Sequence, residues 1–128
     1  MPRHPAILLL VAPLLAQPAV PATPSAAYLA YLAATRDAKV LADLLPHLSK
    51  AYRAMLQSRA KEDHPVWVGR LKEGADLKDV KIESETVSGR SCVLRATATS
   101  AAGNRLRGKI VLVKEGSAWL LSESFWAT

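Results

Sequence analysis

The sequence predicts an α+β protein in which N-terminal helices pack on a four-stranded antiparallel sheet, after a cleaved signal peptide. Three observations lead to this fold class. The chain opens with a short apolar block, residues 24 to about 76 carry apolar side chains at helical spacing, and residues 78–126 alternate apolar and polar side chains. A chain of 128 residues supports one domain with one core, so we expect residues 23–128 to form a single domain.

Residues 1–22 have the order of parts of a secretory signal peptide. A short basic start precedes an apolar block over residues 6–16, and small residues and proline follow. The block is shorter than the roughly 20 apolar residues of a membrane span, so no transmembrane segment is expected. Cleavage after Ala22 fits best, with Ala16 and Ala27 as alternatives. No cysteine near these positions could carry a lipid, so the mature protein is expected in the periplasm or outside the cell.

The mature chain is expected to be basic. Removal of residues 1–22 takes away Arg3, which lowers Lys plus Arg from 17 to 16 against 11 Asp plus Glu, a net charge of about +5. A basic exported protein can meet anionic lipids, cell-wall polymers or nucleic acid, and a moderate charge can also serve solubility alone. Charge therefore does not select a partner.

The first part of the helical region predicts two helices. Ser25 is the expected N-cap of the first helix, in which Tyr28 and Leu32 lie along one side. Asp37 is the expected N-cap of a second helix over residues 37–45, where leucine and valine recur at the spacing of a buried stripe.

Two further helices are expected before the sheet. Pro46 suits the first turn of a third helix, because its missing N–H costs nothing there, and Tyr52 belongs to the apolar face of that helix. A short last helix over residues 62–76 has Trp67 among its apolar anchors and Gly74 as its stop.

The second half of the chain predicts four strands. Three glycine-containing turn signals, SGR near residue 89, AAGN and KEGS, separate the strands. Connections this short force neighbouring strands to run antiparallel. The expected strands are residues 79–87, 91–100, 105–114 and 118–126.

The alternation gives the predicted sheet one apolar and one basic face. The apolar face collects Val80, Ile82, Cys92, Leu94, Leu106, Ile110 and Leu112. The opposite face carries Arg95, Thr97, Thr99, Arg105, Arg107 and Lys109. We therefore expect helices on the apolar face and solvent on the basic face.

The stretches YLAYLAATRDAKVLADLL and VLVKEGSAWLL, in this order of elements, resemble the nuclear transport factor 2-like superfamily, a cystatin-like cone fold. Within it, the chain is similar to small exported bacterial domains of unknown function, whose last hairpin has a Glu-Gly or Asp-Gly turn followed by tryptophan. The resemblance covers most of residues 25–126. It implies a curved sheet that encloses a pocket with the helices, and a homodimer through the sheet. The superfamily contains cyclases, isomerases, dehydratases and binding modules, so the resemblance does not select a function.

Two catalytic candidates follow from the need for an ionisable group in a dry site. Glu123 shares strand parity with Trp119 and Phe125, which would place its carboxylate among aromatic rings inside the cone. The alternative is that Glu123 lies on the rim. Asp63 and His64 are the second candidate, although Asp63 is also a suitable helix-start residue.

A ligand pocket is expected at Tyr52, Trp67 and Trp119, although Trp119, just past the last turn, more simply closes the core. The function that the sequence favours is an exported, small, noncatalytic binding or accessory module for a small ligand or protein partner. The alternative is a small acid–base enzyme of the cyclase or isomerase kind that uses a carboxylate in the cone.

Other chemistries lack their residues. The mature chain has one cysteine, Cys92, so no intrachain disulfide can form. Its two histidines, His47 and His64, are far apart in sequence, so no zinc site is expected. Glycine-rich phosphate loops and a G-x-S-x-G turn are absent from the sequence, so no cofactor is expected. Aromatic residues are not interleaved with the basic residues of the sheet face, which argues against specific nucleic-acid binding.

Overall fold

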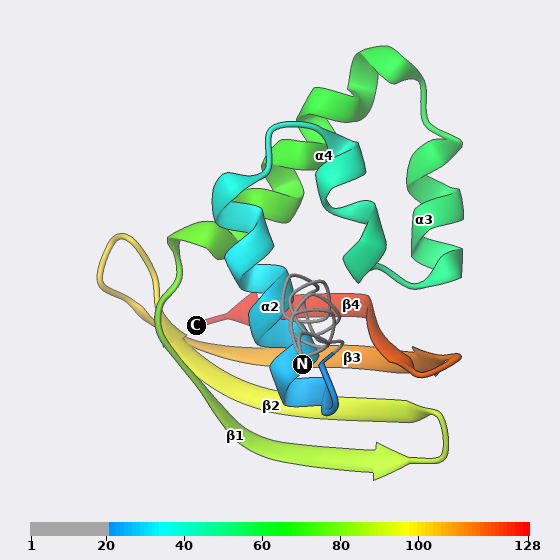
Figure 1. Ribbon diagram of the computed structural model, residues 1–128. Coiled ribbons are helices and arrows are strands. Elements are labelled where there is room, and N and C mark those ends of the chain that lie inside the picture. The colour runs from blue at the N-terminus through cyan, green and yellow to red at the C-terminus, as the bar shows by residue number, and fades with distance from the viewer. Residues whose placement is uncertain (1–20) are drawn as a thin grey trace, which may run out of the picture.

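Helices come first in the chain and an open, four-stranded antiparallel sheet follows, as Figure 1 shows for the computed structural model. The structure describes residues 21–128, so almost all of the predicted signal peptide lies outside the described residues. The predicted α+β class is confirmed. The helices are α2 (Pro24–Asp37), α3 (Lys50–Gln57) and α4 (His64–Leu71), and the strands are β1 (Lys78–Ser88), β2 (Ser91–Thr99), β3 (Arg105–Glu115) and β4 (Ala118–Ala127).

Helix α2 begins one residue before the predicted N-cap. The side chain of Thr23 accepts a hydrogen bond from the backbone N–H of Ala26 at 3.1 Å, so Thr23 caps the helix and the prediction of Ser25 was wrong. Pro24 explains the shift, because proline suits the first helical position. Ser25 instead donates its backbone N–H and its hydroxyl to the carboxylate of Glu85 in β1, at 3.0 and 2.7 Å.

The predicted helix over residues 37–45 does not form. Asp37 is the last residue of α2, and the carboxylate of Asp43 accepts the backbone N–H groups of residues 39 and 40. This side chain instead caps the start of a 3₁₀ segment at Leu41, and Pro46 supplies no donor to continue a helix. Two short 3₁₀ segments replace the helix: Leu41–Asp43 and Leu45–His47.

The third helix starts later than Pro46. Ser49 caps α3 by accepting the backbone N–H of Tyr52 at 3.2 Å. The carboxylate of Glu115, in the last turn of the sheet, accepts the backbone N–H of Lys50 at 3.0 and 3.2 Å. A negative charge stabilises the positive end of a helix dipole. Glu115 therefore ties the start of α3 to the sheet, as Glu85 ties the start of α2.

The last predicted helix is shorter than expected. Residues 64–71 form α4, and the flanking parts of the predicted range are 3₁₀ segments. Gly74 lies in the second of these segments and does not mark the end of α4. The flanking segments are Lys61–Asp63 and Lys72–Asp76. Within residues 21–128, no helix is long and apolar enough to cross a membrane.

The sheet agrees with the prediction in strand number, strand order and direction. The order is β1-β2-β3-β4, every neighbouring pair is antiparallel, and each strand boundary lies within two residues of its predicted place. Gly116 adopts a positive φ of 63° in the last turn, a conformation that glycine takes without steric cost.

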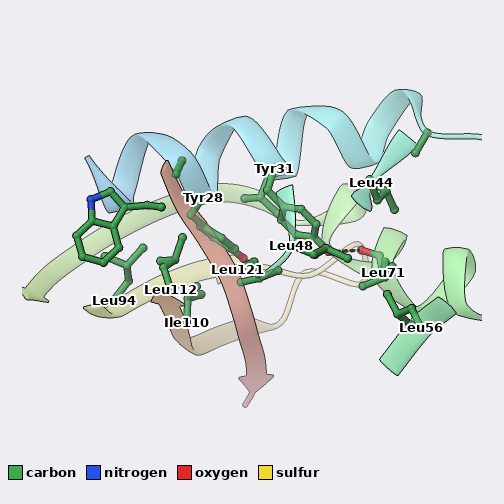
Figure 2. Close-up of a cluster of buried hydrophobic side chains, with 14 of the residues drawn as sticks. Tyr28, Tyr31, Leu44, Leu48, Leu56, Leu71, Leu94, Ile110, Leu112 and Leu121 are labelled. Atoms are coloured by element: carbon green, nitrogen blue, oxygen red, sulfur yellow. Dashed lines mark hydrogen bonds between the residues drawn. The ribbon is translucent and has the colours of Figure 1, made fainter. Parts of the chain in front are cut away.

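The core forms between the helices and the inner face of the sheet, where Figure 2 shows Tyr28 and Tyr31 of α2 together with leucines of the other elements. Cys92, as predicted, is buried at 1% exposure. Most of the predicted apolar face is fully buried. The remaining side chains, on the edge strand β1 and at the start of β3, are half-buried. The fully buried members are Cys92, Leu94, Ile110 and Leu112, and the half-buried members are Val80, Ile82 and Leu106.

A bulge interrupts the pairing of β3 with β4. Ile110 lies opposite Ser124, whereas Leu112, two residues further, lies opposite Leu121, three residues back along β4. One extra residue therefore sits in β4 between these pairs, and the alternation of its side chains reverses there. At the same place the backbone N–H of Ser49 donates to the carbonyl oxygen of Leu121 at 2.8 Å.

The bulge overturns the predicted parity of the last strand. Trp119 faces the core, but Phe125, expected on the same face, lies on the outer face at 68% exposure. Trp126 faces inward instead, packs over Gly108 of β3, and donates its indole N–H to the hydroxyl of Tyr28 at 3.2 Å. Glu123 is exposed and does not enter the interior.

Candidate functional site

A pocket of about 150 Å³ lies where α2, α3 and α4 meet the inner face of β4 beyond the bulge. We name it the helix–sheet pocket. All three tyrosines of the chain line it. Its lining residues are Tyr28, Tyr31, Leu32, Tyr52, Trp67, Arg70, Leu71, Glu73, Gly74 and Ser124.

The tyrosines of the pocket are neutral hydrogen-bonding groups. Tyr31 donates its hydroxyl to the carbonyl oxygen of Leu71 at 3.2 Å, the dashed line in Figure 2. Burial raises the pKa of Tyr28 to about 12 and also raises the pKa of Tyr31 and of Tyr52. These phenols keep their protons at neutral pH, so they can orient a ligand but cannot act as bases.

Trp67 is held between two arginines at the pocket. The guanidinium carbons of Arg59 and Arg70 lie 5.4 and 5.0 Å from the centroid of its ring. Cations within about 6 Å of an indole ring are attracted to its face, so both arginines favour this position of the ring. Glu73, with an exposed side chain, adds a carboxylate to the lining. The pocket thus combines apolar rings with one charge of each sign.

The structure brings together two of the three predicted pocket residues. Tyr52 and Trp67, from α3 and α4, both line the helix–sheet pocket. Trp119 does not line it: its side chain is 9% exposed and belongs to the core, with the ammonium of Lys114 5.8 Å from its ring centroid. Trp119 therefore closes one end of the core.

The predicted catalytic residues lie outside the pocket. Glu123 lines an adjoining groove of about 330 Å³ beside α3, which shares Tyr52 and Ser124 with the pocket, and its side chain is exposed there. Asp63 is exposed, and His64 is half-buried with its Nε2 3.2 Å from the carbonyl oxygen of Arg59. Neither candidate supplies an acid or base to a dry cavity.

Sequence reasoning missed most lining residues of the pocket, among them Tyr28, Tyr31, Glu73 and Ser124. Tyr28 and Tyr31 stand at i and i+3 on α2 and gave a visible signal, because such residues share a helix face. Ser124 gave none, since it reaches the pocket only through the bulge. Glu73 lies in the 3₁₀ segment after α4, where the sequence predicted a continuing helix.

Within residues 21–128, no group of three or more His, Cys, Asp or Glu side chains could hold a metal ion. His47 packs edge-on against Tyr31, with ring centroids 6.2 Å apart, and burial lowers its pKa. In the same part of the chain, every buried side-chain nitrogen or oxygen has a hydrogen-bond partner.

Comparisons with known proteins give no match. No family model, no curated protein and no solved structure matches this chain. The resemblance to the nuclear transport factor 2-like superfamily therefore stays a prediction, and the function proposed below rests on the geometry of the site.

Proposed function

We propose that this chain is an exported, noncatalytic binding module of the nuclear transport factor 2-like kind that holds a small ligand in the helix–sheet pocket. The observation that supports this most is the lining itself, in which three protonated tyrosines and Trp67 surround a space between helices and sheet. Ligand pockets in proteins combine apolar and aromatic walls with a few convergent polar groups. The curved sheet beneath three helices in Figure 1 is in keeping with the cone fold.

The volume of the pocket limits the ligand. About 150 Å³ matches the volume of a cavity that accepts one benzene ring, but this pocket opens to solvent and its walls are more polar than those of such a cavity. It lies well below the roughly 300–1,000 Å³ of pockets that bury drug-sized molecules. The proposed ligand therefore has one ring, or a branched group of similar size, and a polar group that reaches the hydroxyls of Tyr28 and Ser124.

The alternative, an acid–base enzyme, would need another base than Glu123. Glu73 is the carboxylate that lines the pocket, and its side chain is exposed. A general base at neutral pH works best with a pKa near the working pH, which usually requires burial. Neutral tyrosines around a solvated carboxylate favour binding over turnover.

The proposal is tested by native mass spectrometry of the protein recovered from the exported fraction after expression of the full chain. We expect an N-terminus at Thr23 and a bound small molecule that is lost in Trp67→Ala. Val66→Ala is the matched control, because Val66 is a neighbour on α4 and is 57% exposed. The ligand role is refuted if the wild-type protein carries no bound molecule and if no compound of single-ring size from a library changes its amide NMR shifts.

The same material separates binding from catalysis. The released ligand is incubated with wild-type protein and with Glu73→Gln, and its mass and NMR spectrum are followed. An unchanged ligand in both supports the binding module. Conversion by the wild type and not by Glu73→Gln would establish the enzyme instead.

A further inference from the structure

The outer face of the sheet carries a second site, independent of the helix–sheet pocket. A groove of about 630 Å³ crosses this face and is lined by residues of all four strands. Four of its lining side chains are basic and exposed, and Glu83 of β1 is the acidic side chain among the lining residues. The basic residues are Arg95, Arg105, Arg107 and Lys109.

Repulsion between two of the basic side chains lowers the stability of the sheet. Arg95 of β2 lies directly opposite Lys109 of β3. Their other register partners are Ser84 and Phe125, and the acidic Glu83 is the extra residue of the β1 bulge next to Ser84. Like charges directly opposite each other destabilise a sheet, and an anion between them removes that repulsion. The same charge opposes the predicted homodimer through this face, because two basic surfaces would meet.

Three of the basic side chains form a row along β3, and their spacing is similar to that of the charged groups in an extended polymer. Arg105, Arg107 and Lys109 occupy alternate positions of β3, so their Cα atoms are spaced about 6.8 Å apart on one face. An extended chain of phosphodiesters can place successive phosphates along such a row. A flat lipid surface fits less well, because the site is a groove.

An aromatic ring stands beside this row. Phe125 of β4 lies directly opposite Lys109, lines the groove and is 68% exposed. The bulge in β4 puts it there, which is why the sequence pattern assigned it to the other face. Exposed aromatic rings beside basic grooves stack the bases of single-stranded nucleic acids.

We infer that this groove binds a short segment of single-stranded nucleic acid without sequence preference. The four basic side chains of the groove contact phosphates, and one base stacks on Phe125. Phosphates alone would explain the cations but not the exposed ring, and a nucleotide chain satisfies both. The predicted absence of specific nucleic-acid binding is compatible with this role, because stacking and charge do not distinguish sequences.

Fluorescence anisotropy with a labelled oligothymidine of about 12 nucleotides tests the inference. Contact of four basic residues with four phosphates predicts a slope of about −2.8 for the logarithm of the binding constant against the logarithm of salt concentration. Arg107→Gln or Lys109→Gln should each reduce the magnitude of this slope by about 0.7. Phe125→Ala should weaken binding by about 5- to 150-fold with the slope unchanged, and Phe125→Trp should retain binding.

Matched variants separate the groove from general effects of charge and surface. Arg36→Gln and Lys61→Gln remove exposed cations from the helical side and should leave binding unchanged, as should Leu29→Ala on α2. Glu83→Gln should tighten binding, which tests the site even where a basic-residue variant folds poorly. Thermal melting of each variant checks folding.

Three outcomes overturn the inference. In the first, polyphosphate competes as effectively per phosphate as oligothymidine, and Phe125→Ala has no effect on binding. The groove would then be a general polyanion site. Another is binding to vesicles of phosphatidylglycerol and phosphatidylcholine without binding to the oligonucleotide. The third is oligonucleotide binding that Arg107→Gln, Lys109→Gln and Glu83→Gln all leave unchanged.

Discussion

Gly108 and Trp126 provide a sensitive test of how the last strand is packed. A Cβ atom at Gly108 would lie 2.7 Å from three carbons of the Trp126 ring, whereas ordinary contact begins at 3.4 Å. In Gly108→Ala the indole must therefore retreat by at least about 0.7 Å, the difference of these two distances. The hydrogen bond from the indole N–H to Tyr28, now 3.2 Å long, weakens or breaks as a result.

The expected loss of stability follows from these changes. Overpacking a core costs about 1–3 kcal/mol, and a lost neutral hydrogen bond costs about 0.5–1.5 kcal/mol. Replacement of glycine by alanine returns about 0.4–1 kcal/mol by restricting the unfolded chain. Gly108→Ala should therefore lower the free energy of unfolding by about 0.5–4 kcal/mol.

Urea unfolding followed by circular dichroism measures this loss as a lower midpoint at an unchanged m-value. The melting temperature should fall by about 4–8 °C per kcal/mol in a domain of roughly 100 residues. Gly69→Ala is the control, because a Cβ there meets nothing within 4 Å and alanine favours the helix α4. The reasoning fails if Gly108→Ala is as stable as the wild type, or if it costs as much when Trp126 is replaced by leucine.

Three further predictions concern a helix start, alkaline stability and the pocket. Glu115→Ala should cost about 1 kcal/mol in urea unfolding, because the backbone N–H of Lys50 loses its acceptor at the start of α3, and Glu115→Gln should keep most of the stability. Unfolded tyrosine ionises near pH 10, but burial raises the pKa of Tyr28 to about 12. The folded state therefore holds more protons between pH 10 and 12, so stability should fall as pH rises through that window, less steeply in Tyr28→Phe. Trp67→Ala should abolish binding of a ring-sized ligand by removing one wall of the pocket, as measured by calorimetry.

Each of these predictions has a result that contradicts it. Equal midpoints for Glu115→Ala and the wild type would show that Ser49 alone caps α3. A stability that is flat from pH 9 to 12, with the protein still folded, would mean that Tyr28 ionises as readily folded as unfolded. Full ligand affinity in Trp67→Ala would place the ligand outside the helix–sheet pocket.

The sequence predicted the elements whose signals are local. Strand limits followed from alternation and from glycine turns, and these depend on residues a few positions apart. The helix predicted over residues 37–45 failed because a local side chain intervened: Asp43 accepts the backbone N–H groups of residues 39 and 40 and caps a 3₁₀ segment instead. Tyr52 and Trp67 come to line one pocket because each belongs to the apolar side of its own helix.

The sequence by itself determined the α+β class, the four antiparallel strands, the buried Cys92 and the basic sheet face, because periodicity and turn residues carry that information. Only the tertiary structure decided which side chains of β4 face the helix–sheet pocket and which face the outer groove. One extra residue in β4, next to the hydrogen bond from Ser49 to Leu121, moves Ser124 into the pocket and Phe125 onto the basic groove. A strand's own alternation cannot reveal this bulge, since register is set by the partner strand and by the chain that packs against the edge.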